Sequence, residues 1–189
     1  MTVFFTSDTH FGDTRVLRID RRPFANPAAM DEALIANWNA VVGPDDVVWH
    51  LGDFAIRQSG ARVAALLAAL NGRKHLIIGN NDPASTISQP GWESAGHYAE
   101  IDVDGVRLVM AHYAFRTWNG MGRGAIDLHG HSHGRLKPMT RQIDVGVDVW
   151  DYRPVTLAQM LQARRLRQPS VRPSVETSSG LPTNHNRRA

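Results

Sequence analysis

Five short polar motifs in this chain contain residue types that bind metal ions, and each motif follows a short apolar run. In chain order the motifs are Asp8-Thr9-His10, Gly52-Asp53, Gly79-Asn80-Asn81-Asp82, His112 and Gly130-His131-Ser132-His133. Their carboxylates, imidazoles and amide are ligands that suit first-row divalent metal ions. The chain has no cysteine, so a metal site would use nitrogen and oxygen ligands alone. The motifs therefore predict a metal site of the kind that catalyses hydrolysis.

The spacing within the motifs indicates how one site could form. In an extended segment, residues two apart point to the same side. Asp8 and His10 have that spacing, as do His131 and His133, so each pair could approach one ion. Asp53 has two carboxylate oxygens and could bridge two ions.

The elements that must position these motifs are predicted to be strands alternating with helices. The apolar runs before the motifs predict strands at 3–5, 47–49, 75–78, 108–110 and 126–128. Three segments of helical period begin with the capping residues Asn26, Ser59 and Thr156. Two further runs flank Asp104-Gly105 and predict a β-hairpin. The pattern is typical of an α/β layered domain with the site at its strand ends.

Length and composition favour one domain followed by a tail. The chain has 189 residues, 42% of them hydrophobic, which is enough for one sizeable core. We expect the domain to span residues 1–167. Residues 168–189 are rich in Pro, Ser, Thr, Asn and Arg without periodicity, which predicts a basic, disordered tail. There is no basic leader and no run of membrane-spanning length, so we expect a cytoplasmic protein without a membrane partner.

The basic charge of the chain lies mainly in that tail. From Arg164 onward there are six arginines and one acid, which leaves residues 1–163 slightly acidic. Such a tail either contacts a polyanion such as a nucleic acid or is a solvated end. The globular part itself has no basic excess that would indicate nucleic-acid binding.

At its five motifs the chain resembles the calcineurin-like metallophosphoesterases. Their pattern is D-x-H, G-D, G-N-H-[DE], a histidine after a strand, and G-H-x-H, and the resemblance covers roughly residues 1–165. It implies a four-layer α/β/β/α sandwich of two mixed sheets flanked by helices. The residues around the five motifs also resemble those of a bacterial or phage subgroup of small phosphoesterases.

The resemblance also implies two divalent ions, which in this family are usually manganese, iron or zinc. The first ion would be held by Asp8, His10 and His133. The second would be held by Asn80, His112 and His131, with Asp53 bridging the two. Such ions, ~3.5–4 Å apart, would clamp a phosphate and activate a water for in-line attack. By this resemblance, Asp53 and His112 are expected to act in catalysis together with Asn81.

Asn81 departs from the family pattern. The family has a histidine there, which stabilises the transition state and often protonates the leaving oxygen. An amide can donate a hydrogen bond to a phosphoryl oxygen, but it cannot supply a proton. Asp82, another histidine or a water could take that role instead. Because family members without this histidine tend to favour phosphodiesters, Asn81 favours a phosphodiesterase.

A glycine-rich loop, 116–124, is a candidate for contacts with substrate. Arg116 or Arg123 could pair with phosphate, and Trp118 could stack on a base. The alternative is a surface loop with one buried aromatic residue. Arg21 and Arg22 are either further substrate contacts or a solvated charge pair. His50 lies within a predicted strand and is expected to be a core histidine.

These features favour small cyclic or linear nucleotides as substrates, since 189 residues leave little room for a long groove. A phosphomonoesterase and a nuclease are the alternative enzymes. A binding scaffold without strong activity is a further alternative, but all seven candidate ligand positions carry competent residues.

Overall fold

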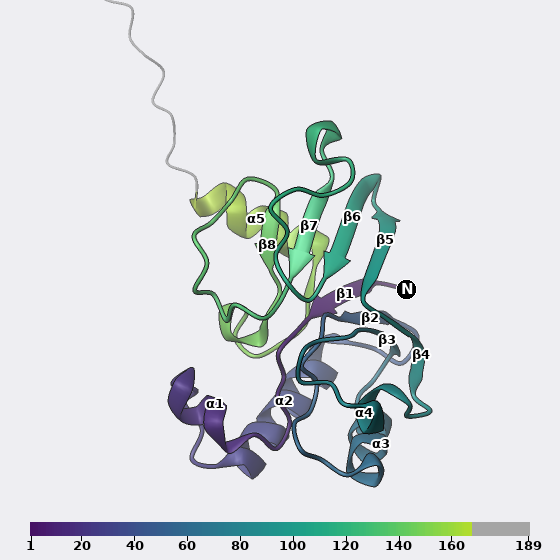
Figure 1. Ribbon diagram of the computed structural model, residues 1–189, viewed down its shortest axis with the longest axis vertical. Coiled ribbons are helices and arrows are strands. Elements are labelled where there is room, and N and C mark those ends of the chain that lie inside the picture. Colours follow the sequence, from purple (N-terminus) through teal and green to yellow (C-terminus); the bar gives the residue numbers. More distant parts are fainter. Residues whose placement is uncertain (168–189) are drawn as a thin grey trace, which may run out of the picture.

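Two β-sheets pack face to face in the computed structural model, which describes residues 1–167, and helices lie around them (Figure 1). The first sheet has the strand order β4-β3-β2-β1-β9. Its strands are β1 (Val3–Thr6), β2 (Val47–His50), β3 (Arg73–Ile77), β4 (Trp92–Gly96) and β9 (Val155–Thr156). β1 to β4 are parallel and β9 is antiparallel to β1, so the carboxyl ends of β1, β2 and β3 lie at one edge.

The second sheet has the strand order β5-β6-β7-β8. Its strands are β5 (Tyr98–Val103), β6 (Val106–Ala111), β7 (Ile126–His129) and β8 (Gln142–Asp144). β5 and β6 form the predicted hairpin, and the other pairs are parallel. Asp104 and Gly105 at its turn have φ values of 50° and 75°, the pair of positive values that a tight hairpin turn requires.

The described residues form the helices α1 (Thr14–Ile19), α2 (Pro27–Val41), α3 (Gly60–Ala69), α4 (Ala84–Ile87) and α5 (Leu157–Arg167), with the short 3-10 turns η1 (Met121–Arg123) and η2 (Val147–Val149). Of these, α2, α3 and α5 begin directly after the predicted capping residues. The side chain of Asn26 accepts from the N–H of Ala29, and that of Ser59 accepts from the N–H of Arg62. The predicted helices near 26, 59 and 156 are therefore confirmed.

Neighbouring residues of β1 enter two different cores. Phe4 belongs to a cluster that includes Leu34 and Trp38 of α2, while Phe5 belongs to a cluster that includes Leu108 of β6. Successive side chains of a strand point to opposite faces, so one face of the first sheet meets helices and the other meets the second sheet. The predicted fold of two mixed sheets with flanking helices is confirmed.

The outer face of the second sheet is covered by the loop between β6 and β7. Val109 points away from the inter-sheet core and contacts Trp118 and Ala125, which belong to that loop. Trp118, a buried aromatic residue of this loop, thus completes the packing of the second sheet. On the first sheet, α5 contacts β9 and β1.

Several short elements differ from the sequence prediction. α1, α4, β4, β8 and β9 were not predicted, because each has six residues or fewer and no clear apolar period. Within residues 1–167, none of the helices combines the length and the apolar character needed to cross a membrane. The predicted tail, 168–189, lies outside the described residues.

Candidate metal centre

Loops at the carboxyl ends of five strands carry the five motifs, and they meet at one edge of the two sheets (Figure 1). Asp8 follows β1, Asp53 follows β2 and Asn80 follows β3. His112 follows β6 of the second sheet, and the motif with His133 follows β7. Residues more than a hundred positions apart in the sequence are therefore neighbours in space.

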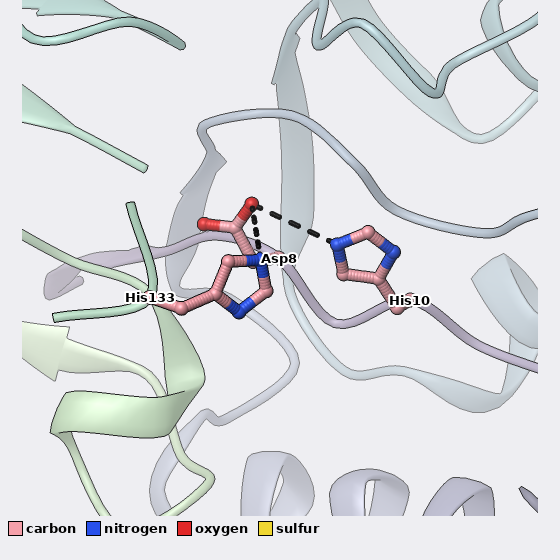
Figure 2. A group of neighbouring side chains, drawn as sticks. All are labelled: Asp8, His10 and His133. Carbon is pink, nitrogen blue, oxygen red and sulfur yellow. Dashed lines mark ion pairs between the residues drawn. The ribbon is translucent and has the colours of Figure 1, made fainter. Parts of the chain in front are cut away.

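Asp8, His10 and His133 form the first group of candidate ligands (Figure 2). One ligand atom from each lies within 4.8 Å of the others. Oδ1 of Asp8 is 3.9 Å from Nε2 of His10 and 3.9 Å from Nε2 of His133. These separations are too long for hydrogen bonds but suit three side chains that share one ion.

Asp53, His112 and His131 form the second group, again within 4.8 Å. Nε2 of His112 is 3.5 Å from Oδ1 of Asp53 and 3.0 Å from Oδ1 of Asn80. Nδ1 of His112 is 2.8 Å from the carbonyl oxygen of Leu51, so this nitrogen is assigned as the donor. Nε2 then faces Asn80 Oδ1 as one acceptor facing another, an arrangement that a cation would stabilise.

Asp53 lies between the two groups. Its Oδ2 is 3.6 Å from Nε2 of His10, and its Oδ1 is 3.5 Å from Nε2 of His112. The backbone N–H of Asn81 donates to Oδ1 at 2.8 Å, and the Asn81 side-chain amide donates to Oδ2 at 2.7 Å. The carboxylate is therefore fixed with one oxygen toward each group.

The side-chain amide of Asn81 thus contacts Asp53, a role that the sequence did not predict. An amide nitrogen carries two hydrogens, and the bond to Asp53 uses one of them. The other hydrogen is available to a phosphoryl oxygen, so the predicted substrate contact stays a prediction.

The backbone at the site is not extended, and the prediction of extended ligand segments is wrong. Five candidate ligands have positive φ: Asp8 (58°), His10 (51°), Asp53 (58°), His131 (65°) and His133 (47°). Non-glycine residues rarely adopt this region, and such strain of about 1–3 kcal/mol per residue concentrates at functional sites. The ligand side chains converge because the chain turns sharply after each strand.

Polar atoms of the first group lack partners. Oδ1 of Asp8 and both ring nitrogens of His10 are buried without a hydrogen bond among the described residues. Burial raises the pKa of Asp8 to about 8 and lowers the pKa of His10. A buried carboxylate oxygen without a partner is costly, and a cation bound at Oδ1 of Asp8 would remove this cost. The residues therefore fit divalent ions held by nitrogen and oxygen.

Hydrogen bonds with Asp148 and Arg22 hold the first group of candidate ligands in place. Nδ1 of His133 donates to Oδ2 of Asp148 at 2.7 Å. Arg22 donates to both oxygens of Asp148 at 2.8 Å, and also to the carbonyls of Asp8 and Thr9. The prediction that Arg22 contacts substrate or solvent is wrong, since its side chain is buried. Although burial opposes it, hydrogen bonds from His133 and Arg22 lower the pKa of Asp148 to about 2.

Asp148 was not predicted as a site residue, because its spacing from the other candidate residues follows no metal-binding pattern. It follows β8, a strand of only three residues, and lies 15 positions after His133. The one available signal is an acidic residue shortly after a short apolar run. Only the packing of η2 against the loop of β7 makes it a neighbour of the site.

Asp82 has a structural role in this centre. Its Oδ2 accepts from the backbone N–H groups of Asp53 and Gly79, and its Oδ1 accepts from that of Phe54, all at 2.8 Å. Burial raises the pKa of Asp82, but both oxygens are directed at the backbone. Asp82 therefore joins the loops of β2 and β3, which weakens the alternative that it protonates a leaving group.

Glycine is required where the loops of β1 and β7 approach one another. A Cβ at Gly130 would overlap the hydroxyl of Ser7 and lie 2.5 Å from Oδ2 of Asp8. That same Oδ2 accepts from the backbone N–H of His131 at 2.9 Å. The close approach lets the loop that carries His131 and His133 reach Asp8.

The predicted substrate loop is only partly placed near the site. Trp118 is buried and its indole N–H donates to the carbonyl of Ala125, so the prediction that it stacks on a base is wrong. Arg123 lines a surface hollow beside Val106, at the end of β6 opposite to His112, so its predicted phosphate contact is wrong too. Arg116 is exposed in this loop, and its contact with substrate stays a prediction.

His50 is the buried core histidine that was predicted. Its Nε2 lies 3.0 Å from the hydroxyl of Thr9, and its ring packs near Trp38, Phe54 and Trp92. Burial lowers its pKa to about 3. It is therefore a neutral packing residue beneath the loop of β1.

Comparisons with known proteins agree with this arrangement. A sequence profile of the calcineurin-like phosphoesterase superfamily domain matches residues 1–148. An uncharacterised protein of Methanocaldococcus jannaschii is 31% identical over 163 residues, covering 82% of this chain and 86% of that protein. The gene 66 protein of Mycobacterium phage D29 is 34% identical over 179 residues, covering 78% of this chain and 88% of that protein. A solved protein of unknown function from Aquifex aeolicus shares the fold, with a TM-score of 0.69 at 22% identity, covering 85% of this chain and 98% of that one.

Proposed function

Because the chain belongs to the calcineurin-like phosphoesterase superfamily, we propose that it is a dinuclear metallophosphoesterase whose substrates are phosphodiesters. The position of Asp53 carries the proposal, since its two oxygens face the two ligand groups from one carboxylate. Divalent ions bound there would activate water and neutralise the negative charge of a phosphoryl group. Seven residues would hold them: Asp8, His10, Asp53, Asn80, His112, His131 and His133.

The remaining polar groups of the site orient these ligands. Asn81 holds the Asp53 carboxylate through two hydrogen bonds and keeps one amide hydrogen for a phosphoryl oxygen. The carbonyl of Leu51 and the carboxylate of Asp148 each hold one ring nitrogen of a histidine and leave the other free to bind. Orientation of this kind lowers the cost of stabilising charge in the transition state.

The preference for diesters rests on Asn81, because family members without a histidine at that position tend to favour phosphodiesters, and the described residues offer no clear proton donor in its place. Asn81 cannot supply a proton, and Asp82 directs both oxygens to backbone N–H groups. General acid catalysis contributes about 10²–10⁴-fold, and poor leaving groups depend on it most. Small cyclic or linear nucleotides are the proposed substrates and manganese is the proposed test metal.

The experiment compares bis-p-nitrophenyl phosphate with p-nitrophenyl phosphate, which share one leaving group, using manganese-loaded protein. We expect a higher kcat/KM for the diester, and Asp53→Asn should remove activity on both. A strong preference for the monoester would contradict the diester proposal. Fewer than two tightly bound metal equivalents would favour the scaffold alternative, and hydrolysis of single-stranded DNA but not of small nucleotides would favour a nuclease.

A further inference from the structure

Tyr113 is an exposed aromatic residue that lies against the second ligand group. Its ring centroid is 4.5 Å from that of His131 and 5.2 Å from that of His112, with both pairs edge-on. Its hydroxyl donates to Oδ1 of Asn80 at 3.3 Å. Three candidate ligands therefore fix one tyrosine in place.

The exposure of Tyr113 is difficult to explain by packing alone. Its surface is 53% exposed, although its ring is held on several sides by the histidines and Asn80. Trp118, five residues later, shows how this loop buries an aromatic residue that serves packing. A rigid ring with an open surface beside a candidate phosphate site is suited to stack on a planar group, because a tyrosine loses little conformational freedom on binding.

We propose that Tyr113 forms a subsite that takes a planar aromatic ring carried by the ester, such as a nucleobase. The inference rests on the proposed phosphoesterase function and adds a substrate class to it. Stacking of a base on an aromatic side chain is worth about 1–3 kcal/mol and accepts any base. Stacking on a base is the role that the sequence offered as one of two alternatives for Trp118, which is buried.

The test uses three diesters with the same p-nitrophenolate leaving group, in which the second ester group is thymidine, phenyl or methyl. For Tyr113→Leu, the ratio of kcat/KM for the thymidine and phenyl esters, whose second ester group has a ring, to that for the methyl ester should fall about 5- to 150-fold, the range that stacking implies. Tyr113→Phe keeps the ring and should keep the ratio. A loss confined to the thymidine ester assigns a nucleobase, and an equal loss for the phenyl ester assigns any aryl ring.

Tyr98 provides the matched control. It is 48% exposed and pairs with Ala111 at the same end of the sheet, but its ring neighbours Phe115 and no candidate ligand. Tyr98→Leu should leave the ratio unchanged. If Tyr113→Leu also leaves the ratio unchanged, the subsite proposal is wrong.

A binding measurement separates this inference from the proposed function. Calorimetry should show that thymidine 5′-monophosphate binds manganese-loaded protein more tightly than methyl phosphate does, and Tyr113→Leu should remove the difference. Failure to hydrolyse any of the three esters would contradict the proposed function, while this binding difference would still support the subsite. Equal binding of both phosphates by the unaltered protein would overturn the subsite.

Discussion

His133 donates from Nδ1 to Oδ2 of Asp148 over 2.7 Å, and this bond determines which ring nitrogen faces Asp8. Because Nδ1 is engaged, Nε2 is the nitrogen directed toward Asp8 Oδ1, 3.9 Å away. Arg22 fixes the carboxylate in turn, through two bonds of 2.8 Å. The orientation of one candidate ligand thus depends on the buried ion pair between Arg22 and Asp148.

Asp148→Asn should therefore weaken divalent-metal binding to the first group. Loss of a partner that orients a metal-binding histidine typically costs 10–100-fold in metal affinity. Titration of metal-free protein with Mn²⁺ in a calorimeter should show one site weakened by this range and the other nearly unchanged. Asp151→Asn is the control, since Asp151 is exposed and its one ion pair among the described residues is with Arg153, at 3.8 Å. Equal Mn²⁺ affinities in the unaltered protein and in both variants would contradict the role of Asp148 in orienting His133.

Asn81→His should raise turnover of phosphomonoesters relative to diesters. An imidazolium can protonate a leaving oxygen, whereas the amide of Asn81 cannot. The gain should be largest for esters with poor leaving groups and cannot exceed about 10⁴-fold. Steady-state kinetics with phenyl phosphate, p-nitrophenyl phosphate and the diester bis-p-nitrophenyl phosphate measure it. Asn81→Gln supplies no proton, so a similar gain in that variant would show that general acid catalysis is not the cause.

Gly130→Ala should disrupt the first group. The added Cβ would overlap the Ser7 hydroxyl and approach Asp8 Oδ2, so the loop with His131 and His133 would have to move. We expect a lower melting temperature and loss of tight Mn²⁺ binding. Gly122→Ala is the matched control, because a Cβ there has open space around it. If both variants bind Mn²⁺ like the unaltered protein, the close approach at Gly130 is not needed.

His50 should make the stability of metal-free protein depend on pH. Burial lowers its pKa from 6.5 to about 3 in the folded state. Between these values the unfolded chain binds a proton that the folded chain does not, so stability is lost as the pH falls below about 6.5. His50→Phe should lessen this loss by up to about 1.4 kcal/mol per pH unit. Denaturant unfolding between pH 7 and 4.5 measures how the free energy of unfolding changes with pH in the unaltered protein and in His50→Phe. The same dependence on pH in both proteins would contradict the prediction.

The sequence alone determined the residues that carry chemistry and the elements that precede them. Each of the five motifs follows a strand, and Asn26, Ser59 and Thr156 mark helix starts, because capping and apolar period are local properties. The hairpin at Asp104-Gly105 is local in the same way. Such features depend on a few neighbouring residues, so they can be read before the chain folds.

The tertiary structure alone decided how these residues are held. Asp148 and Arg22 are 126 positions apart, and no local pattern predicts their pairing behind His133. The left-handed backbone at Asp8 and His10 is maintained by contacts between loops, which override the extended preference of the segment. Packing against the second sheet likewise buried Trp118 and left Tyr113 exposed beside the ligands. Side-chain direction and burial depend on which distant segments meet, and that is settled only when the two sheets pack together.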